Sequence, residues 1–246
     1  MLIYIVFFTS EYDSLIKDDV IATSDYKSEN KGGYSNFNYK KVLEFLGIKS
    51  REFLAKDSEL KEADVDSDTL NHIVKSLINL TKAEGVVDDE GETTRGDFVL
   101  TILYNIVALY YDKEVKLERE FNLVGDDVKV EAKQEGWNLG RAQNLMQLYN
   151  AYIRNISSSH KTDHTVYGAI TSGYTWEIIW CIGPKQEQIL NINDVEEIKS
   201  KLQWEHKAKF DPVEMDISKA PYLWKQRLLP LVKYLAYMIE SSFSNS

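Results

Sequence analysis

The chain has a single cysteine, Cys181, in 246 residues, so an internal disulfide framework is excluded. One cysteine fits a reducing compartment. No apolar run approaches the roughly 20 residues of a membrane span. The apolar residues 2–8 lack a basic flank before them, which favours a buried strand or a first helical turn over a signal peptide. We therefore expect a soluble intracellular protein, cytoplasmic or nuclear, with no membrane partner.

Positive charge is also scarce. The net charge is −10, whereas proteins that coat nucleic acid through charge alone are basic. An acidic total is still compatible with a nuclease, because carboxylates can line a metal site and a local basic patch can persist beside them. The chain is 43% hydrophobic and carries 15 Tyr, 9 Phe and 5 Trp, which excludes a disordered protein and supplies a substantial core.

Hydrophobic periodicity and turn residues divide the chain into helices and strands. Apolar residues at helical spacing predict helices over residues 39–46, 50–56, 67–84, 94–112, 139–156, 195–202 and 223–243. Two strand-like runs, 115–124 and 128–133, are joined at Gly125-Asp126-Asp127. A second pair, 166–171 and 175–181, reads as a hairpin about Ser172-Gly173-Tyr174. A proline at position 230 predicts a break or kink in the last helix.

This order of elements predicts an α/β fold. Residues 94–190 would form the α/β core, with a helical N-terminal extension over 1–93 and a C-terminal helical segment over 191–246 packed on the core. No clear linker separates these parts, so we expect one compact unit.

The hairpin of residues 115–133 separates polar from apolar side chains. A two-residue turn at Gly125-Asp126 sets Glu120 opposite Glu131, and a turn at Asp126-Asp127 sets Glu120 opposite Lys133. Both registers place these three side chains on one polar face, whereas a three-residue turn would mix the faces. Glu120, Glu131 and Lys133 are therefore predicted to converge.

Closely packed carboxylates repel each other unless a cation lies between them. Oxygen ligands suit Mg²⁺ or Mn²⁺. Such a metal can polarise a phosphodiester and activate water, while Lys133 stabilises the developing charge. The alternative is a solvated strand face with cross-strand Glu–Lys pairs, since Glu-x-Lys is a short and common motif.

Several motifs in chain order resemble the PD-(D/E)xK nuclease superfamily. These are Asp97 on a helix, then Val130-Glu131-Ala132-Lys133, then the helix with Gly140-Arg141-Ala142-Gln143, then a strand–turn–strand over residues 166–176. The resemblance covers about residues 94–182 and is nearest to restriction-enzyme subunits and to Crinkler-type effector domains.

The resemblance implies a restriction-endonuclease-like αβββαβ core sheet flanked by helices. It also implies Mg²⁺-dependent hydrolysis of DNA or RNA, with Glu131 and Lys133 catalytic. Asp97 would match the acid of the first helix, and Gln143 the polar residue of the second.

The interval before Glu131 is shorter than in the family, which leaves the second metal ligand open. Glu120 replaces the usual Asp, or Asp127 does so from the turn, or the metal site is degraded. A degraded site would leave a catalytically inactive module that acts through protein or nucleic-acid interaction. In that case the helical extensions offer surfaces for a homodimer or another protein partner.

Trp137 and Arg141 are expected to line a substrate cleft, whereas no role is evident for His206. Trp137 is expected in the loop before the second helix, where a substrate would pass. Arg141, with Lys129 and Lys133, would give the cleft a positive strip. His206 lies in a charged segment and has no evident role.

Overall fold

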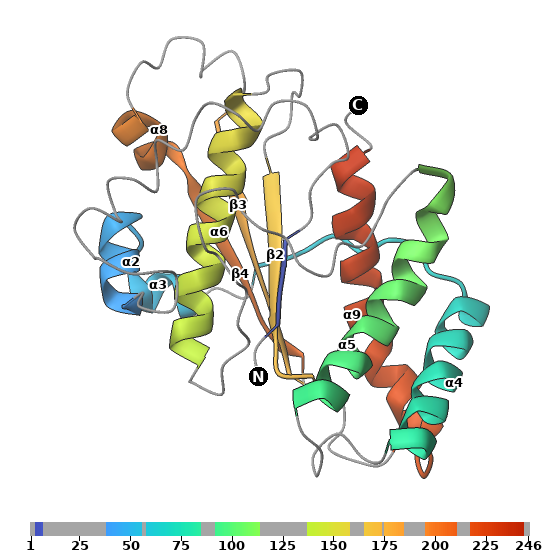
Figure 1. Cartoon of the computed structure of the whole chain (residues 1–246). Coiled ribbons are helices and arrows are strands. Elements are labelled where there is room, and N and C mark those ends of the chain that lie inside the picture. Colours follow the sequence, from blue (N-terminus) through green and yellow to red (C-terminus); the bar gives the residue numbers. More distant parts are fainter. Residues whose placement is uncertain are drawn as a thin grey trace.

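The computed structural model describes residues 3–6, 38–55, 58–84, 92–113, 137–157, 165–173, 175–184, 195–210 and 217–243. These residues form a mixed α/β fold, in which an antiparallel sheet is flanked by helices (Figure 1). The sheet order is β1 (Ile3–Val6), β2 (Thr165–Thr171), β3 (Trp176–Ile182) and β4 (Gln203–Phe210). The helices are α2 (Tyr39–Phe45), α3 (Ser50–Ala55), α4 (Ser67–Glu84), α5 (Glu92–Val107), the 3₁₀ turn η2 (Ala108–Lys113), α6 (Trp137–Ser157), α8 (Val195–Lys201) and α9 (Pro221–Phe243).

The predicted hairpin between residues 166 and 181 is confirmed as β2 and β3. Its register pairs Thr171 with Trp176 at the turn. Gly173 has a φ of 102°, a conformation that side-chain-bearing residues rarely adopt. The Gly173 N–H donates to Thr171 Oγ1 at 3.0 Å, and the Trp176 indole donates to the Gly173 carbonyl at 3.0 Å. These contacts fix the turn and the register of the two strands.

The hairpin is buried on both faces. On one face, Val166, Ile170 and Ile179 pack against Leu145 and Tyr149 of α6, and α2 packs beside α6. Alternation of side chains along a strand sends the intervening residues to the opposite face. A sheet that is buried on both sides explains why both strands are almost continuously apolar.

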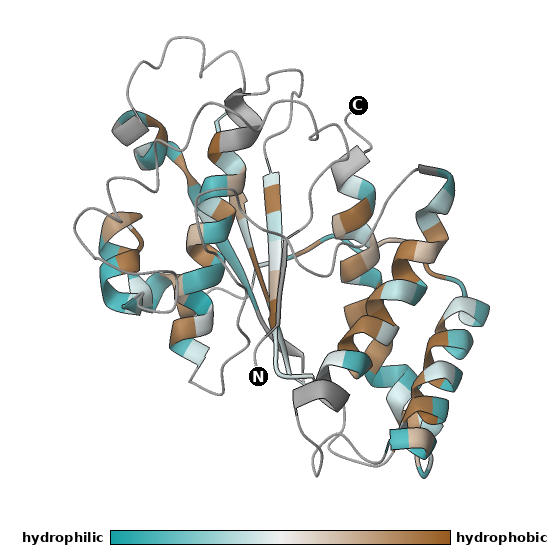
Figure 2. Cartoon of the chain, in the orientation of Figure 1, coloured by the Kyte–Doolittle hydropathy of each residue, from teal (hydrophilic) through white to brown (hydrophobic). Residues whose placement is uncertain are grey.

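The opposite face is covered by the layer of α9, α5 and α4. There Tyr167, Ala169, Trp176 and Ile178 share one core cluster with the apolar residues of these helices. Figure 2 shows the apolar stripes of α4, α5 and α9 where the three helices lie side by side. The extended residues 58–66 connect the two layers, because the Ser58 N–H donates to the His206 carbonyl at 3.1 Å and the Ala63 N–H to the Lys233 carbonyl at 3.2 Å.

All seven predicted helices are present, and their ends differ from the predicted ones by a few residues. The helix expected over 94–112 ends as α5 at Val107 and continues as η2. The last helix runs through Pro230. No helix among the described residues is long and apolar enough to span a membrane.

One strand lies where the sequence predicted a helical segment, because β4 falls within residues 191–246. β1 confirms the strand alternative predicted for residues 2–8, and it pairs with β2 although it belongs to the part of the chain, residues 1–93, that was expected to be a helical extension. In β4, buried Trp204 and His206 alternate with more exposed Glu205 and Lys207, the pattern of a half-buried strand. The predicted hairpin of residues 115–133 lies outside the described residues.

Two aromatic residues of α9 provide a matched test of the core. Trp224 is 1% exposed and packs edge-on against Phe98, with ring centroids 5.6 Å apart, whereas Tyr222 is 72% exposed. Trp224→Ala should lower the free energy of unfolding by about 3–5 kcal/mol, because it empties a large core site. Tyr222→Ala should change it by about 0.5 kcal/mol or less. Urea unfolding followed by circular dichroism measures both, and equal effects would contradict this packing.

Candidate functional site

α6 carries an unusually polar set of buried side chains. Gln143, Asn144, Gln147 and Asn150 are all buried, among the apolar residues of the same helix. Among the residues that the structure describes, both amide atoms of Asn144 and the Oε1 of Gln147 have no hydrogen-bond partner. A buried polar group without a partner costs about 1–3 kcal/mol, so such groups in a core call for an explanation.

Asn144 lies directly on β2. A Cβ built on Gly168 would approach the Asn144 Nδ2 to 2.7 Å, closer than side chains tolerate. Gly168 therefore makes room for the amide of α6 at the centre of the strand. A glycine inside a strand often marks such a close approach of another group.

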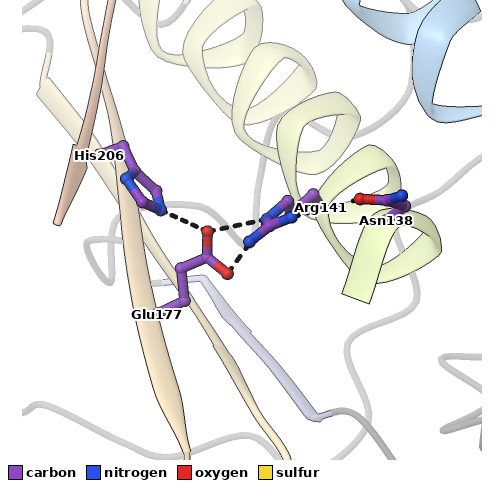
Figure 3. Close-up of polar contacts among 4 residues, drawn as sticks. All are labelled: Asn138, Arg141, Glu177 and His206. Atoms are coloured by element: carbon purple, nitrogen blue, oxygen red, sulfur yellow. Dashed lines mark hydrogen bonds and ion pairs between the residues drawn. The ribbon is translucent and has the colours of Figure 1, made fainter. Parts of the chain in front are cut away.

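Near the start of α6, a buried carboxylate links three elements (Figure 3). The Arg141 Nε of α6 donates to both oxygens of Glu177 on β3, at 2.8 Å and 3.1 Å. The same carboxylate contacts the Nε2 of His206 on β4. The Arg141 Nη1 also donates to the Oδ1 of Asn138 in the first turn of α6, at 3.2 Å. One carboxylate thus joins α6, β3 and β4.

The sheet geometry explains how these side chains meet. Ile179 pairs with His206 across the two strands, and Glu177 lies two residues earlier on the same face. Glu177 is therefore diagonal to His206, within reach of a long side chain. The pairing of β3 with β4 also shifts register between Trp176 and Ile178. Such bulges bend a strand and re-aim its side chains.

Neighbouring side chains shield most of the network from solvent. The Glu177 side chain is 0% exposed and that of Arg141 is 14% exposed. The Phe53 ring of α3 lies 5.3 Å from the His206 ring, centroid to centroid. The Tyr39 hydroxyl, at the start of α2, is influenced by the charges of both Arg141 and Glu177.

Two opposing effects set the ionisation of Glu177. Burial alone raises the pKa of the carboxyl group, but hydrogen bonds from His206 and Arg141, with their charges, outweigh it and hold the pKa below its ordinary value. A carboxylate accepts hydrogen bonds only, so the His206 Nε2 must carry the proton of their shared contact. Burial is also the main cause that raises the pKa of the Tyr39 hydroxyl.

The structure places two of the predicted site residues. Gln143 lies on α6, while Asp97 lies on α5, where its carbonyl accepts from Thr101 Oγ1 at 2.7 Å. The buried residues of these two helices belong to different clusters on opposite faces of the sheet, so Asp97 and Gln143 are not brought together. The remaining predicted site residues lie outside the described residues: Glu120, Asp127, Glu131 and Lys133. Within the described part of the chain, no three His, Cys, Asp or Glu side chains gather as a metal site.

Three expectations from the sequence need correction. Arg141 does not supply free positive charge, because Glu177 neutralises it. Trp137 is not in a loop but is the first residue of α6, partly buried against the core. His206 is not without a role, because it is buried and contacts Glu177. The sequence signal for this buried network was Glu177, the single acid in the otherwise apolar run of β3.

Comparison of the chain with protein families, with characterised proteins and with solved structures finds no match.

The buried network predicts a strong effect of removing its charge. Glu177→Gln leaves Arg141 without a counter-ion in a nearly dry site and should lower the free energy of unfolding by about 3–5 kcal/mol. Glu52→Gln is the matched control, because Glu52 pairs with Lys49 at 3.4 Å on the surface, with the two side chains 70% and 77% exposed. It should cost about 1 kcal/mol or less. Chemical denaturation at pH 7 measures both, and similar losses would show that the Glu177 network is not held in a dry interior.

The lowered pKa of Glu177 predicts how stability depends on pH. A depressed folded pKa contributes stability that is full above the unfolded pKa, about 4.3, and is lost as the pH falls toward the folded pKa. The difference in unfolding free energy between the unaltered chain and Glu177→Gln should be constant above about pH 5.5 and shrink below about pH 4.5. Denaturation curves across this range test it, and a difference that stays constant under acid would refute the lowered pKa.

Proposed function

We propose that the chain is a metal-dependent nuclease of the PD-(D/E)xK type that hydrolyses phosphodiester bonds in DNA or RNA. The observation that carries the proposal is the set of buried amide side chains on α6, which includes Gln143. A core does not need these groups for packing. They lie on the helix that begins four residues after Lys133, where the resemblance to this superfamily expects a polar helix.

The order of elements supports the same proposal. α6 is followed directly by the β2–β3 hairpin, the strand–turn–strand that the resemblance leads one to expect. In the proposed αβββαβ core, α5 and α6 are the two helices, and the predicted strands of residues 115–133 lie between them. α5 and α6 cover opposite faces of the sheet (Figure 1).

The donor set of the predicted site fits a hard divalent cation. Glu131, with Glu120 or Asp127, offers carboxylate oxygens, which Mg²⁺ and Mn²⁺ prefer. A bound ion would supply Lewis acidity toward the phosphodiester and toward water. Lys133 would orient the attacking water or stabilise charge on the phosphate.

The other two predicted residues have supporting roles in this proposal. Gln143 would hold water or phosphate through its neutral amide, since a glutamine side chain both donates and accepts. Asp97 belongs to the layer on the other face of the sheet, so a direct contact with the site is not part of its proposed role.

One observation favours a second candidate, a catalytically inactive nuclease-like module that acts through protein or nucleic-acid interaction. The predicted positive strip loses Arg141 to its ion pair with Glu177. Lys129 and Lys133 are then the remaining cations of that strip, in a chain with net charge −10. Weak phosphate binding is a feature expected of a module without activity.

Cleavage of plasmid, single-stranded DNA and RNA with Mg²⁺ or Mn²⁺ tests the proposal. Glu131→Gln should reduce cleavage by about 100-fold or more, because it removes a charged metal ligand, and Lys133→Ala should do so through lost charge stabilisation. Glu135→Gln is the matched control, because it makes the same chemical change four residues away and should leave the rate unchanged. EDTA should abolish cleavage.

Two further variants identify the second ligand. The larger loss in Glu120→Gln or in Asp127→Asn shows which acid shares the ion with Glu131. Full activity of a Glu131→Gln, Lys133→Ala double variant would refute this site. Absence of cleavage with all substrates, but with retained binding to nucleic acid or protein, would establish the inactive module instead.

A further inference from the structure

We propose that Glu177 and His206 are positioning residues, which act through Arg141 to fix the first turns of α6 on the sheet. The expected effect on catalysis rests on the proposed function, whereas the expected effect on the placement of α6 does not. Glu177 is 36 residues from Arg141 and 29 residues from His206 along the chain, so the network is purely tertiary.

The apolar part of the α6 contact does not by itself fix the position of the helix. Leu145, Met146 and Tyr149 pack on an apolar sheet face, and apolar contacts are not directional. A helix on such a face can shift by one residue, which is 1.5 Å along its axis and 100° around it. The Arg141 Nε–H, by contrast, is shared between both oxygens of Glu177, while Nη1 bonds to Asn138. These directional contacts require one distance and one orientation of the guanidinium plane.

The carboxylate itself is held from the other side. His206 contacts Glu177 from β4, and the shifted pairing of β3 and β4 beside Glu177 aims the carboxylate at α6. Phe53 packs on the His206 ring from α3, and Tyr39 faces the network from α2. Side chains from α2, α3 and β4 therefore lie around the contact between Glu177 and Arg141.

Along the chain, Arg141 lies between Lys133 and Gln143, two residues of the proposed site. Gln143 is two residues later on the same rigid helix, so any rotation of α6 moves it. Lys133 is four residues before Trp137, and four residues span at most about 14 Å. The network thus sets where Gln143 lies and where the chain from Lys133 must arrive.

Arg141→Ala and its chemical rescue test this inference in the full chain. With a cleavable substrate, Arg141→Ala should lower kcat roughly 100-fold, the loss expected of a misplacement of about 1 Å, with a much smaller change in KM. Ethylguanidinium chloride, well below denaturing concentrations, should restore kcat, because Arg141 is 14% exposed and its place can be filled from solvent. Ethylammonium should not restore it, since it lacks the planar guanidinium that reaches Glu177 through Nε and Asn138 through Nη1.

Two further variants distinguish a loss of positioning from a loss of folding. Arg141→Lys keeps the charge and should fold, yet it should show the same kcat defect because an ammonium cannot reproduce the planar contact. Lys49→Ala is the surface control, since it breaks an exposed ion pair on α3 and should leave kcat and KM unchanged. An unchanged kcat in folded Arg141→Lys and in Arg141→Ala would overturn the positioning role.

Hydrogen exchange separates the inference from the proposed function. Backbone amides in the first two turns of α6 should exchange faster in Arg141→Ala and in Glu177→Gln, with ethylguanidinium slowing the exchange only in the former. This is expected whether or not the chain cleaves nucleic acid. Unchanged exchange would overturn the positioning role of the network. Faster exchange in a chain that cleaves no substrate would support the positioning role and reject the nuclease.

Discussion

The architecture depends on one constraint, the burial of β3 on both faces. Trp176, Ile178 and Trp180 face the layer of α4, α5 and α9, while Ile179 and Cys181 face α6. A strand in this position needs partners on both edges for its backbone groups and a helical layer on each side. β2 and β4 supply the edges, and the two groups of helices supply the layers.

Most helices were predictable because their signal is local. In α4, buried Leu70, Ile73, Val74 and Leu77 repeat at the helical period, and that periodicity survives in the fold. The β2–β3 hairpin was also predictable, since its turn residues and its two apolar runs are adjacent in sequence. β4 was not, because the polar His206 occupies one of its buried positions and its partner β3 precedes it by a helix and a connection. The pairing that makes it a strand is non-local.

The residues of the candidate site also differ in whether their signal is local. Gln143 was predicted from the local motif Gly140-Arg141-Ala142-Gln143 on a helix, and the structure places it on α6. Glu177, Arg141 and His206 could not be identified by spacing, because their contacts cross 36 and 29 residues. A charged residue inside the apolar run of β3 does signal a buried partner in principle, since an unpaired buried carboxylate is costly. The sequence does not say which cation meets it.

Stability alone does not explain why Glu177 is charged. A buried ion pair replaced by well-packed apolar residues of similar size is often as stable or more so, because desolvation offsets the attraction. α6, which Glu177 contacts through Arg141, also carries Asn144, whose fully buried amide has no hydrogen-bond partner within the described part of the chain. Local rules are broken in this way chiefly at functional sites, where precise placement matters more than stability. Glu177 of β3 and Asn144 of α6 both lie at the contact between α6 and the sheet. The local rules are therefore broken where the position of α6 is set, which is the part of the fold on which the proposed function depends.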